Sequence, residues 1–241
     1  MTQHTEFNFP LSSDREITLT SAPGAFMPTG TTKLLIDAVQ QKIVKPVSLL
    51  DLGCGTGVVG LALHLHGLVK SPLYASDLSE PGVSCSKINL KRYECVSEVR
   101  NGSLFEPWLG NKFDVIVDDI SGIAQEVAAV SPWFQGVPCK SGKDGTSLVA
   151  DIIRQAPQYL TKQGRFFFPL ISLSNVDSLL NTAKENFNTI EMVARQEWPL
   201  PDELKQHMSL LERLSDEGCI KLKKKFGMFL WYTEIYCAYN V

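Results

Sequence analysis

The sequence lacks a long apolar run. Its most apolar stretch, residues 58–69, is about twelve residues long and includes two histidines and two glycines, whereas a membrane-spanning helix needs ~20 apolar residues. The N-terminus is polar and has no basic segment followed by an apolar core, so no signal peptide is predicted. We therefore expect a cytoplasmic protein that does not bind a membrane.

The chain also lacks an excess of charge of either sign and any closely paired cysteines. Its 23 basic and 26 acidic residues give a net charge of −3, which disfavours a dedicated nucleic-acid-binding protein. The basic run at residues 221–225 is therefore interpreted as part of a solvated surface loop; the alternative is that it contacts phosphate or RNA. The six cysteines have no C-x-x-C spacing, which argues against a zinc ribbon and favours free thiols. His64 and His66 would face different directions on a predicted helix, so no metal site is expected.

Short apolar runs alternate with amphipathic segments along the 241 residues. This order predicts a doubly wound α/β fold of parallel strands joined by helices. The last apolar run alternates aromatic and polar residues, so that strand is expected to pair antiparallel. The predicted strands cover residues 47–51, 73–77, 96–100, 113–118, 164–171, 188–194 and 228–238. The predicted helices cover residues 31–44, 58–66, 80–93, 146–160, 176–186 and 201–215.

The most informative motif is the glycine-rich run at residues 49–57, Leu-Leu-Asp-Leu-Gly-Cys-Gly-Thr-Gly. A buried strand leads into a turn with three alternating glycines, which permit positive φ and leave room for a ligand beside the backbone. The dinucleotide-binding motif requires glycine where Val58 stands, and the Gly-Lys-Ser/Thr of a phosphate loop is absent. The turn is therefore better suited to a ligand without a pyrophosphate.

Two acids frame this turn. Asp51 precedes it, and Asp77 follows Gly57 by twenty residues, at the carboxyl end of the next predicted strand. An acid there can accept hydrogen bonds from both hydroxyls of a ribose, and ligands of open α/β sheets bind at this edge. We therefore predict an adenosine ligand with a cationic or zwitterionic tail. The alternative is that the glycines form a tight turn and that Asp77 caps a helix.

Residues 51–57 together with Asp77 resemble motif I and the acidic loop of class I S-adenosylmethionine-dependent methyltransferases. Within that class, the chain further resembles the HemK-type branch of glutamine N5-methyltransferases. The segments that carry this second resemblance are residues 26–32, 102–107, 142–145 and 152–160.

The resemblance covers residues 24–241 and implies a Rossmann-like methyltransferase fold. Such a fold has a seven-stranded, mostly parallel sheet with an antiparallel C-terminal strand. We therefore expect an S-adenosylmethionine-binding domain at residues 31–241, preceded by a lid or hairpin at residues 1–30.

The resemblance also implies where S-adenosylmethionine would bind. The turn glycines would line the methionine part of the cofactor, and the acid after the second strand would hold the ribose. The Ser-Leu pair of residues 103–104 would border the adenine, and the threonines before the first helix would contact the amino-acid end. The predicted cofactor-binding set is Thr29, Thr32, Asp51, Gly53, Gly55, Gly57, Asp77, Leu78, Ser103 and Leu104.

The chain departs from the HemK branch after the fourth predicted strand. That branch carries Asn-Pro-Pro-Tyr there and binds a planar amide or amine, whereas residues 118–123 read Asp-Asp-Ile-Ser-Gly-Ile. Asp119 stands at the Asn position, so a glutamine amide or an adenine is not expected as the acceptor. An acid there can instead bind an ammonium or guanidinium group or act as a general base, and Asp118 can assist it. The alternative is that Asp118 caps a helix and that Asp119 is solvated.

The short N-terminal segment is not expected to hold a separate domain that grips a macromolecule. With the near-zero charge, this favours a small amine- or guanidine-bearing metabolite as the acceptor, methylated at a nitrogen, and disfavours nucleic acid. Ser121 and Phe134 are expected to bind that substrate, although the aromatic pair at residues 133–134 can equally be a hydrophobic plug.

Three alternatives stay open. The enzyme could cyclise the aminocarboxypropyl group of the cofactor itself and release methylthioadenosine, or it could methylate protein or RNA. The fold could also serve as a non-enzymatic binding partner.

Overall fold

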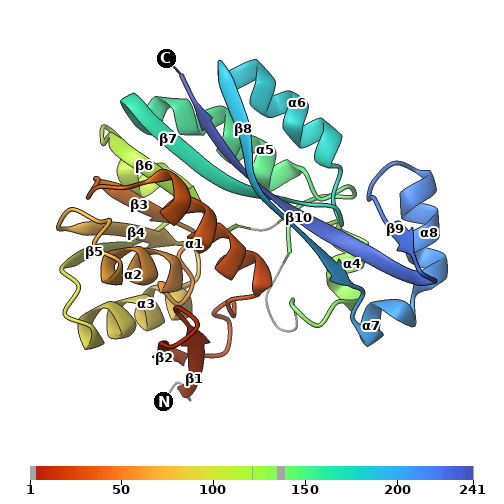
Figure 1. Ribbon diagram of the computed structural model, residues 1–241, viewed down its shortest axis with the longest axis horizontal. Coiled ribbons are helices and arrows are strands. Elements are labelled where there is room, and N and C mark those ends of the chain that lie inside the picture. The colour runs from red at the N-terminus through yellow and green to blue at the C-terminus, as the bar shows by residue number, and fades with distance from the viewer. Residues whose placement is uncertain (1–3, 121, 135–138, 241) are drawn as a thin grey trace.

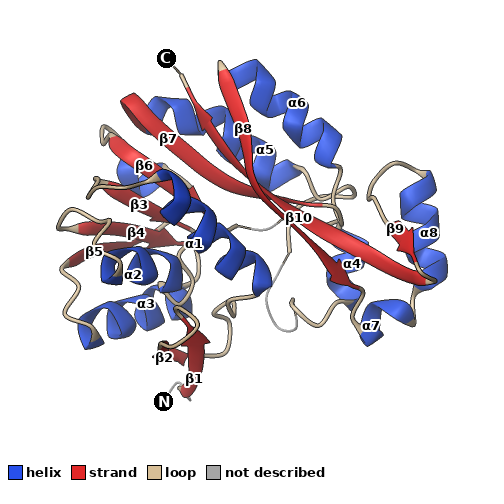
Figure 2. Cartoon of the chain, viewed as in Figure 1, coloured by secondary structure: helices blue, strands red, loops and turns tan. Residues whose placement is uncertain are grey.

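The computed structural model describes residues 4–120, 122–134 and 139–240 and is built around one large twisted sheet (Figures 1 and 2). Seven strands follow one another across this sheet in the order β5-β4-β3-β6-β7-β10-β8. Neighbours are parallel except at β10, which runs antiparallel to both β7 and β8. In that order the strands are β5 (Ser97–Asn101), β4 (Leu73–Asp77), β3 (Leu49–Leu52), β6 (Phe113–Asp118), β7 (Leu160–Ile171), β10 (Met228–Tyr239) and β8 (Thr189–Pro199).

This arrangement confirms the predicted Rossmann-like fold class with an antiparallel C-terminal strand. One further short strand, β9 (Lys223–Lys225), pairs with the beginning of β10. It lies in a stretch that was predicted to be a loop.

Helices cover both faces of the sheet because successive side chains of a buried strand point to opposite faces. Leu49 of β3 belongs to one core with α1 (Gly30–Lys42), α2 (Val58–Leu65) and α3 (Glu80–Arg92). Its neighbour Leu50 belongs to a second core with α5 (Ser147–Gln155) and α6 (Val176–Asn186). None of the helices within the described ranges is long and apolar enough to cross a membrane.

A third, smaller core lies beyond the carboxyl end of β8. It joins α4 (Gln125–Val130) to α7 (Asp202–Lys205) and α8 (Met208–Asp216), and its buried residues include Trp231 of β10. The single helix predicted at residues 201–215 is therefore wrong, because the backbone leaves helical geometry at His207 (φ −116°, ψ 33°). The break turns the second helix so that Leu211 and Leu214 join Leu204 in this core.

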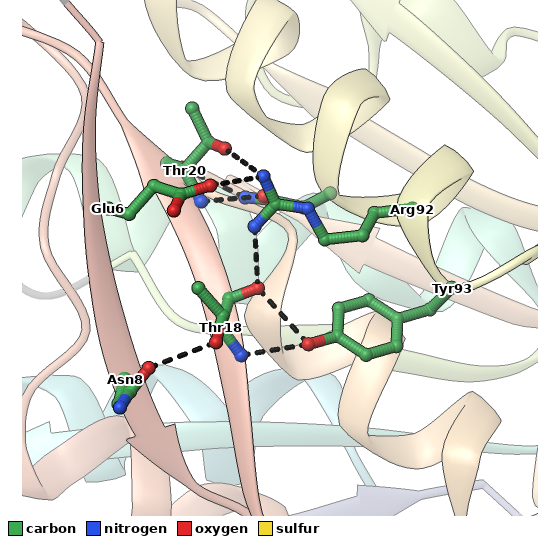
Figure 3. A network of polar contacts seen from close by, with 7 residues as sticks. Glu6, Asn8, Thr18, Thr20, Arg92 and Tyr93 are labelled. Atoms are coloured by element: carbon green, nitrogen blue, oxygen red, sulfur yellow. Dashed lines mark hydrogen bonds and ion pairs between the residues drawn. The ribbon is translucent and has the colours of Figure 1, made fainter.

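An antiparallel hairpin of β1 (Thr5–Pro10) and β2 (Glu16–Ser21) forms a separate two-stranded sheet against α3 (Figure 3). Arg92 donates to the Thr18 carbonyl (3.0 Å) and to the Thr20 hydroxyl (3.2 Å). The Tyr93 hydroxyl accepts from the Thr18 amide at 2.8 Å. These polar contacts fix the hairpin over the helix that follows β4.

Candidate cofactor and acceptor site

A cavity of about 540 Å³ opens at the carboxyl ends of β3, β4 and β6. Ligands of open α/β sheets bind at this edge, and the volume is that of a small-molecule site. Of the predicted cofactor-binding residues, the following line the cavity: Gly53, Gly55, Asp77, Leu78, Ser103 and Leu104. Asp119, the predicted catalytic acid, lines it as well.

The glycine turn requires glycine at Gly53 and at Gly57 for different structural reasons. At Gly53 φ is +69°, and an added Cβ would lie 2.1 Å from Cγ1 of Ile120, which also lines the cavity. At Gly57 φ is +78°, and a Cβ would lie 2.6 Å from the Ser86 hydroxyl. Gly53 therefore lets the β3 turn approach the segment after β6, whereas Gly57 lets it pack on α3.

Asp77 links the glycine turn to the segment after β4. Its Oδ2 accepts from the Gly55 amide and its Oδ1 from the Ser79 amide, each at 2.7 Å. Burial raises the pKa of Asp77, and these two amide bonds oppose that rise. Each oxygen keeps a further lone pair for a hydroxyl donor. The N-cap of α3 is Ser79, not Asp77, so the helix-capping alternative does not describe this carboxylate.

Asp51 and Asp118 lie behind the cavity wall rather than in it. Both are fully buried; Asp51 accepts from the Gly60 amide at 2.9 Å and Asp118 from the Ile120 amide at 2.9 Å. The second oxygen of each has no hydrogen-bond partner within the described part of the chain. Burial raises the pKa of Asp51 to about 7 and that of Asp118 well above its ordinary value. Their predicted roles in binding and catalysis stay predictions.

Asp119 is joined directly to the first helix. The Thr32 hydroxyl donates to Asp119 Oδ2 at 2.7 Å and accepts from the Thr29 amide at 3.0 Å. Thr29 is the N-cap of α1, where its side chain accepts from the Thr31 amide. The two predicted threonines thus lie beside the predicted catalytic acid. Burial raises the pKa of Asp119 to about 7, and the bond from Thr32 opposes that rise.

A second cavity, of about 280 Å³, lies beside the first, between the N-terminus of α1 and the ends of β7 and β8. Its lining includes five aromatic residues, Phe26, Trp133, Phe134, Trp198 and Trp231, together with Thr29, Gly30, Thr31 and several apolar residues. Phe26 and Phe134 line both cavities, and their ring centroids are 5.3 Å apart. The two spaces therefore meet at this aromatic pair.

Phe134 was predicted at the substrate side and lies there, whereas Ser121 falls outside the described residues. Trp198 and Trp231 were not predicted. They come from β8 and β10, face each other across the two strands, and have ring centroids 5.9 Å apart. The signal that would have found them is the antiparallel pairing of the aromatic-rich β10 with the end of β8 that carries Trp198. The strand prediction for residues 188–194 ended too early to show it.

Comparison with known proteins identifies the fold and its cofactor class. Residues 16–119 match the family described as Methyltransferase small domain. The ribosomal protein L11 methyltransferase of Staphylococcus carnosus (strain TM300) is 26% identical over 192 residues, which cover 77% of this chain and 53% of the relative. The L11 methyltransferase of Staphylococcus aureus is 30% identical over 113 residues, 45% of this chain and 35% of the relative. The chain thus spans about half the length of the first of these relatives and about a third of the length of the second.

Solved structures share the architecture. The Thermus thermophilus 16S rRNA N2 G1207 methyltransferase, in complex with S-adenosylmethionine and guanosine, has a TM-score of 0.64 at 16% identity and covers 99% of this chain and 51% of its own. The L11 methylase of Lactobacillus delbrueckii subsp. bulgaricus has a TM-score of 0.56 at 17% identity, covering 90% of this chain and 83% of its own.

These matches confirm the predicted resemblance to class I S-adenosylmethionine-dependent methyltransferases, with S-adenosylmethionine as the cofactor. The relatives named are L11 methyltransferases, a branch related to the predicted HemK type. The prediction of a small-molecule partner, with nucleic acid disfavoured, is wrong. By their names, these relatives act on ribosomal protein L11 and on 16S rRNA, which are macromolecules.

Proposed function

We propose that this chain is a methyltransferase that transfers the methyl group of S-adenosylmethionine to an amino group on a ribosomal protein. The observation that carries the proposal is the position of Asp119. It lines the cofactor cavity and is bonded to Thr32, three residues from Thr29 in the wall of the aromatic cavity. A carboxylate that lines the cofactor cavity and is hydrogen-bonded to the helix bordering the aromatic cavity can serve both the group that is transferred and the group that receives it.

The residues of the larger cavity fit the cofactor. Asp77 offers carboxylate oxygens to the ribose hydroxyls, Gly53 and Gly55 leave the turn backbone open to the cavity, and Ser103 and Leu104 border the remaining part. S-adenosylmethionine supplies, when bound, a methyl group activated by a sulfonium. The protein then has to position a nucleophile in line with the carbon–sulfur bond and to exclude water.

Asp119 would prepare that nucleophile. A protonated amine has no lone pair to donate, so it must lose a proton before it can attack. A carboxylate whose pKa is raised to about 7 can take that proton near neutral pH. The ammonium proton would pass to Asp119 first; the neutral nitrogen would then bond to the methyl carbon as the carbon–sulfur bond breaks, so that a neutral thioether leaves and the acceptor becomes a methylated ammonium. Thr32 holds Oδ2, which leaves Oδ1 for the amine.

The aromatic cavity supports an amine as the acceptor. Trp133, Trp198 and Trp231 border a space of about 280 Å³, and aromatic faces attract a cationic nitrogen at close range. Phe26 and Phe134 stand at the passage to the cofactor cavity, where apolar rings keep water from the reacting atoms. The sequence similarity to L11 methyltransferases supports a ribosomal protein as the molecule that carries this amine.

The test is methyl transfer from S-adenosylmethionine labelled in its methyl group to ribosomal subunits from cells in which the gene for this protein is deleted. We expect label that a protease releases and ribonuclease does not, recovered as a methylated amine after acid hydrolysis. Label confined to RNA would contradict the proposal. So would release of methylthioadenosine with no acceptor present, because that product requires cyclisation of the cofactor.

A matched pair of variants tests the role of the acid. Asp119→Asn should keep S-adenosylmethionine binding and lose roughly 10²-fold or more in transfer rate, the usual contribution of a positioned general base. Asp151→Asn makes the same chemical change at an exposed residue of α5 that pairs with Arg154, and it should leave both quantities unchanged. Equal transfer by the two variants would remove Asp119 from the mechanism.

A further inference from the structure

A basic segment stands out against the charge of the rest of the chain. Residues 218–233 contain four lysines and no acid, in a chain whose net charge is −3. Three of the lysines form β9, which folds back on the first residues of β10. We refer to residues 223–229 as the basic hairpin.

The turn of the basic hairpin is built at a conformational cost. Phe226 (φ +50°) and Gly227 (φ +77°) both have positive φ, as a two-residue hairpin turn of the primed type requires. Asparagine or aspartate usually fills the first of these positions, and a bulky residue there is a genuine outlier. The Phe226 side chain gains no burial in return, since it is 90% exposed. Folding alone gives no reason for a phenylalanine at this position, whereas contact with a ligand does.

The charges at the tip of the basic hairpin are unneutralised. Lys221 and Lys223 each reach a carboxylate, Asp177 at 2.6 Å and Glu197 at 2.5 Å. Lys224 and Lys225 have no carboxylate partner within residues 4–120, 122–134 and 139–240. Their ammonium groups lie instead 5.3 Å from the ring centroid of Phe229 and 5.9 Å from that of Phe226.

The basic hairpin leads directly to the aromatic cavity. On β10, Phe229 pairs with Lys224 of β9, and Trp231 pairs with Trp198 of β8. Phe229 and Trp231 are two residues apart and therefore lie on the same face of the strand. Trp231 follows Met228 by three positions along the strand, a distance of about 10 Å. A molecule held at the tip would thus lie beside the entrance for the acceptor.

We propose that the basic hairpin binds single-stranded RNA next to the acceptor. Lys224 and Lys225 are consecutive strand residues on opposite faces, so they would contact phosphates on either side of a base that stacks on the exposed ring of Phe226, the combination by which proteins hold single strands. The proposal rests on the proposed function, because a ribosomal protein is surrounded by RNA in its particle. The hairpin would then favour the assembled particle over the free protein as substrate.

The test measures RNA binding directly and does not depend on methyl transfer. The probe is a fluorescently labelled single-stranded RNA of mixed sequence, followed by anisotropy at increasing salt. The double variant Lys224→Glu/Lys225→Glu should bind at least tenfold more weakly, and the slope of log affinity against log salt should fall by about 1.4, the value for two phosphate contacts on a single strand. Phe226→Ala should lose about fivefold or more with the salt slope unchanged.

A matched control makes the same charge change elsewhere. Lys87→Glu/Lys91→Glu alters two exposed lysines of α3 and should leave RNA affinity within twofold of the unchanged protein. Both double variants should bind S-adenosylmethionine normally, which shows that they are folded. Equal RNA affinity of the two double variants would overturn the proposal, as would tighter binding to phosphatidylglycerol vesicles than to RNA. Failure of methyl transfer with RNA binding intact would reject the proposed function alone.

Discussion

Single residues of the glycine turn carry conformations that other residues cannot adopt cheaply. Gly53→Ala would place a methyl group in a backbone with φ +69° and 2.1 Å from Ile120. We expect a loss of roughly 2–5 kcal/mol of stability and loss of S-adenosylmethionine binding, because Ile120 also lines the cavity. Chemical denaturation and calorimetric titration measure the two effects.

Gly67 is the matched control for this change. Its φ is +72°, and an added Cβ would meet nothing within 4 Å. Gly67→Ala should therefore cost only the backbone strain, roughly 1–2 kcal/mol, and should leave cofactor affinity unchanged. If the two variants bound the cofactor equally well, the close approach at Gly53 would have no part in forming the site.

The Asp119 carboxyl should impose a pH dependence on the reaction. Burial raises its pKa to about 7, and only the ionised form can accept a proton. The value of kcat/KM measured at low concentrations of both substrates, which reports the free enzyme, should therefore rise with pH and level off above about 7. Asp119→Asn should remove this rise together with most of the activity. If the rate of Asp119→Asn rose with pH over the same pH range and by the same factor, the titrating group would be a residue other than Asp119.

The site residues that could be predicted from the sequence are those that each lie at the end of a strand or in the turn directly after it. Gly53, Asp77 and Asp119 all lie at the edge where the parallel strands end. Trp198 and Trp231 could not be found this way, because their meeting depends on the register of two distant strands. Pairing of this kind is a property of the folded sheet and leaves little local signal.

At the scale of elements, the β1–β2 hairpin is tied to the cofactor turn through one buried side chain. The Asn89 amide group donates to the carbonyls of Thr20 and Thr56, each at 2.9 Å, and accepts from the Thr20 amide at 2.7 Å. Thr20 belongs to β2, whereas Thr56 lies in the glycine turn and lines the cofactor cavity. The hairpin and the turn are therefore positioned by the same residue.

Asn89→Ala should loosen both elements at once. It removes three hydrogen bonds and leaves buried backbone groups without partners, which should cost roughly 2–4 kcal/mol. Arg92→Ala is the comparison (its contacts are drawn in Figure 3), because its bonds to Glu6 and to the Thr18 carbonyl of the same hairpin are exposed and should contribute roughly 1 kcal/mol or less. Hydrogen exchange of the β2 amides and cofactor affinity should both change in Asn89→Ala. An effect no larger than that of Arg92→Ala would show that the turn does not depend on the hairpin.

Element boundaries were predictable where a chemical signal marks them. The helix predicted at residues 146–160 ends as α5 at Gln155 and continues as a 3₁₀ turn, because Pro157 cannot donate to an α-helical bond. β8 runs on to Pro199 although residues 195–197 are charged or polar. That extension follows from its place at the edge of the sheet, where one side is solvated, and the sequence alone does not reveal which strand is the edge.

At the scale of the whole molecule, the seven main strands of the large sheet followed from the alternation of apolar and amphipathic segments, whereas their order across the sheet was not predicted. The acceptor class did not, because chain length and net charge describe averages over the molecule. A net charge of −3 concealed a sixteen-residue segment with four lysines and no acid. Charge indicates the kind of partner only where charged side chains of one sign cluster on one surface, and the fold decides whether they cluster.

The three carboxyls at the carboxyl ends of β3 and β6 should make the stability of the whole protein depend on pH. The folded-state pKa values of Asp51 and Asp119 are raised to about 7, and that of Asp118 is raised further, chiefly by burial. The folded protein therefore holds more protons than the unfolded chain above about pH 4. This contribution to stability is complete below about pH 4 and is lost as the pH rises through about 7.

Urea unfolding of the cofactor-free protein between pH 5 and 8 measures this dependence. Each buried carboxyl should lower the free energy of unfolding by up to about 1.4 kcal/mol per pH unit within its window. Asp51→Asn removes one titrating group and should flatten the curve, while Asp151→Asn on the exposed face of α5 should leave its slope unchanged. A cationic cofactor beside these acids favours their ionised forms, so added S-adenosylmethionine should restore stability most strongly at the higher pH. A stability that rose from pH 5 to 7 in the unchanged protein, and equally in Asp51→Asn, would mean that these carboxyls are ionised in the fold.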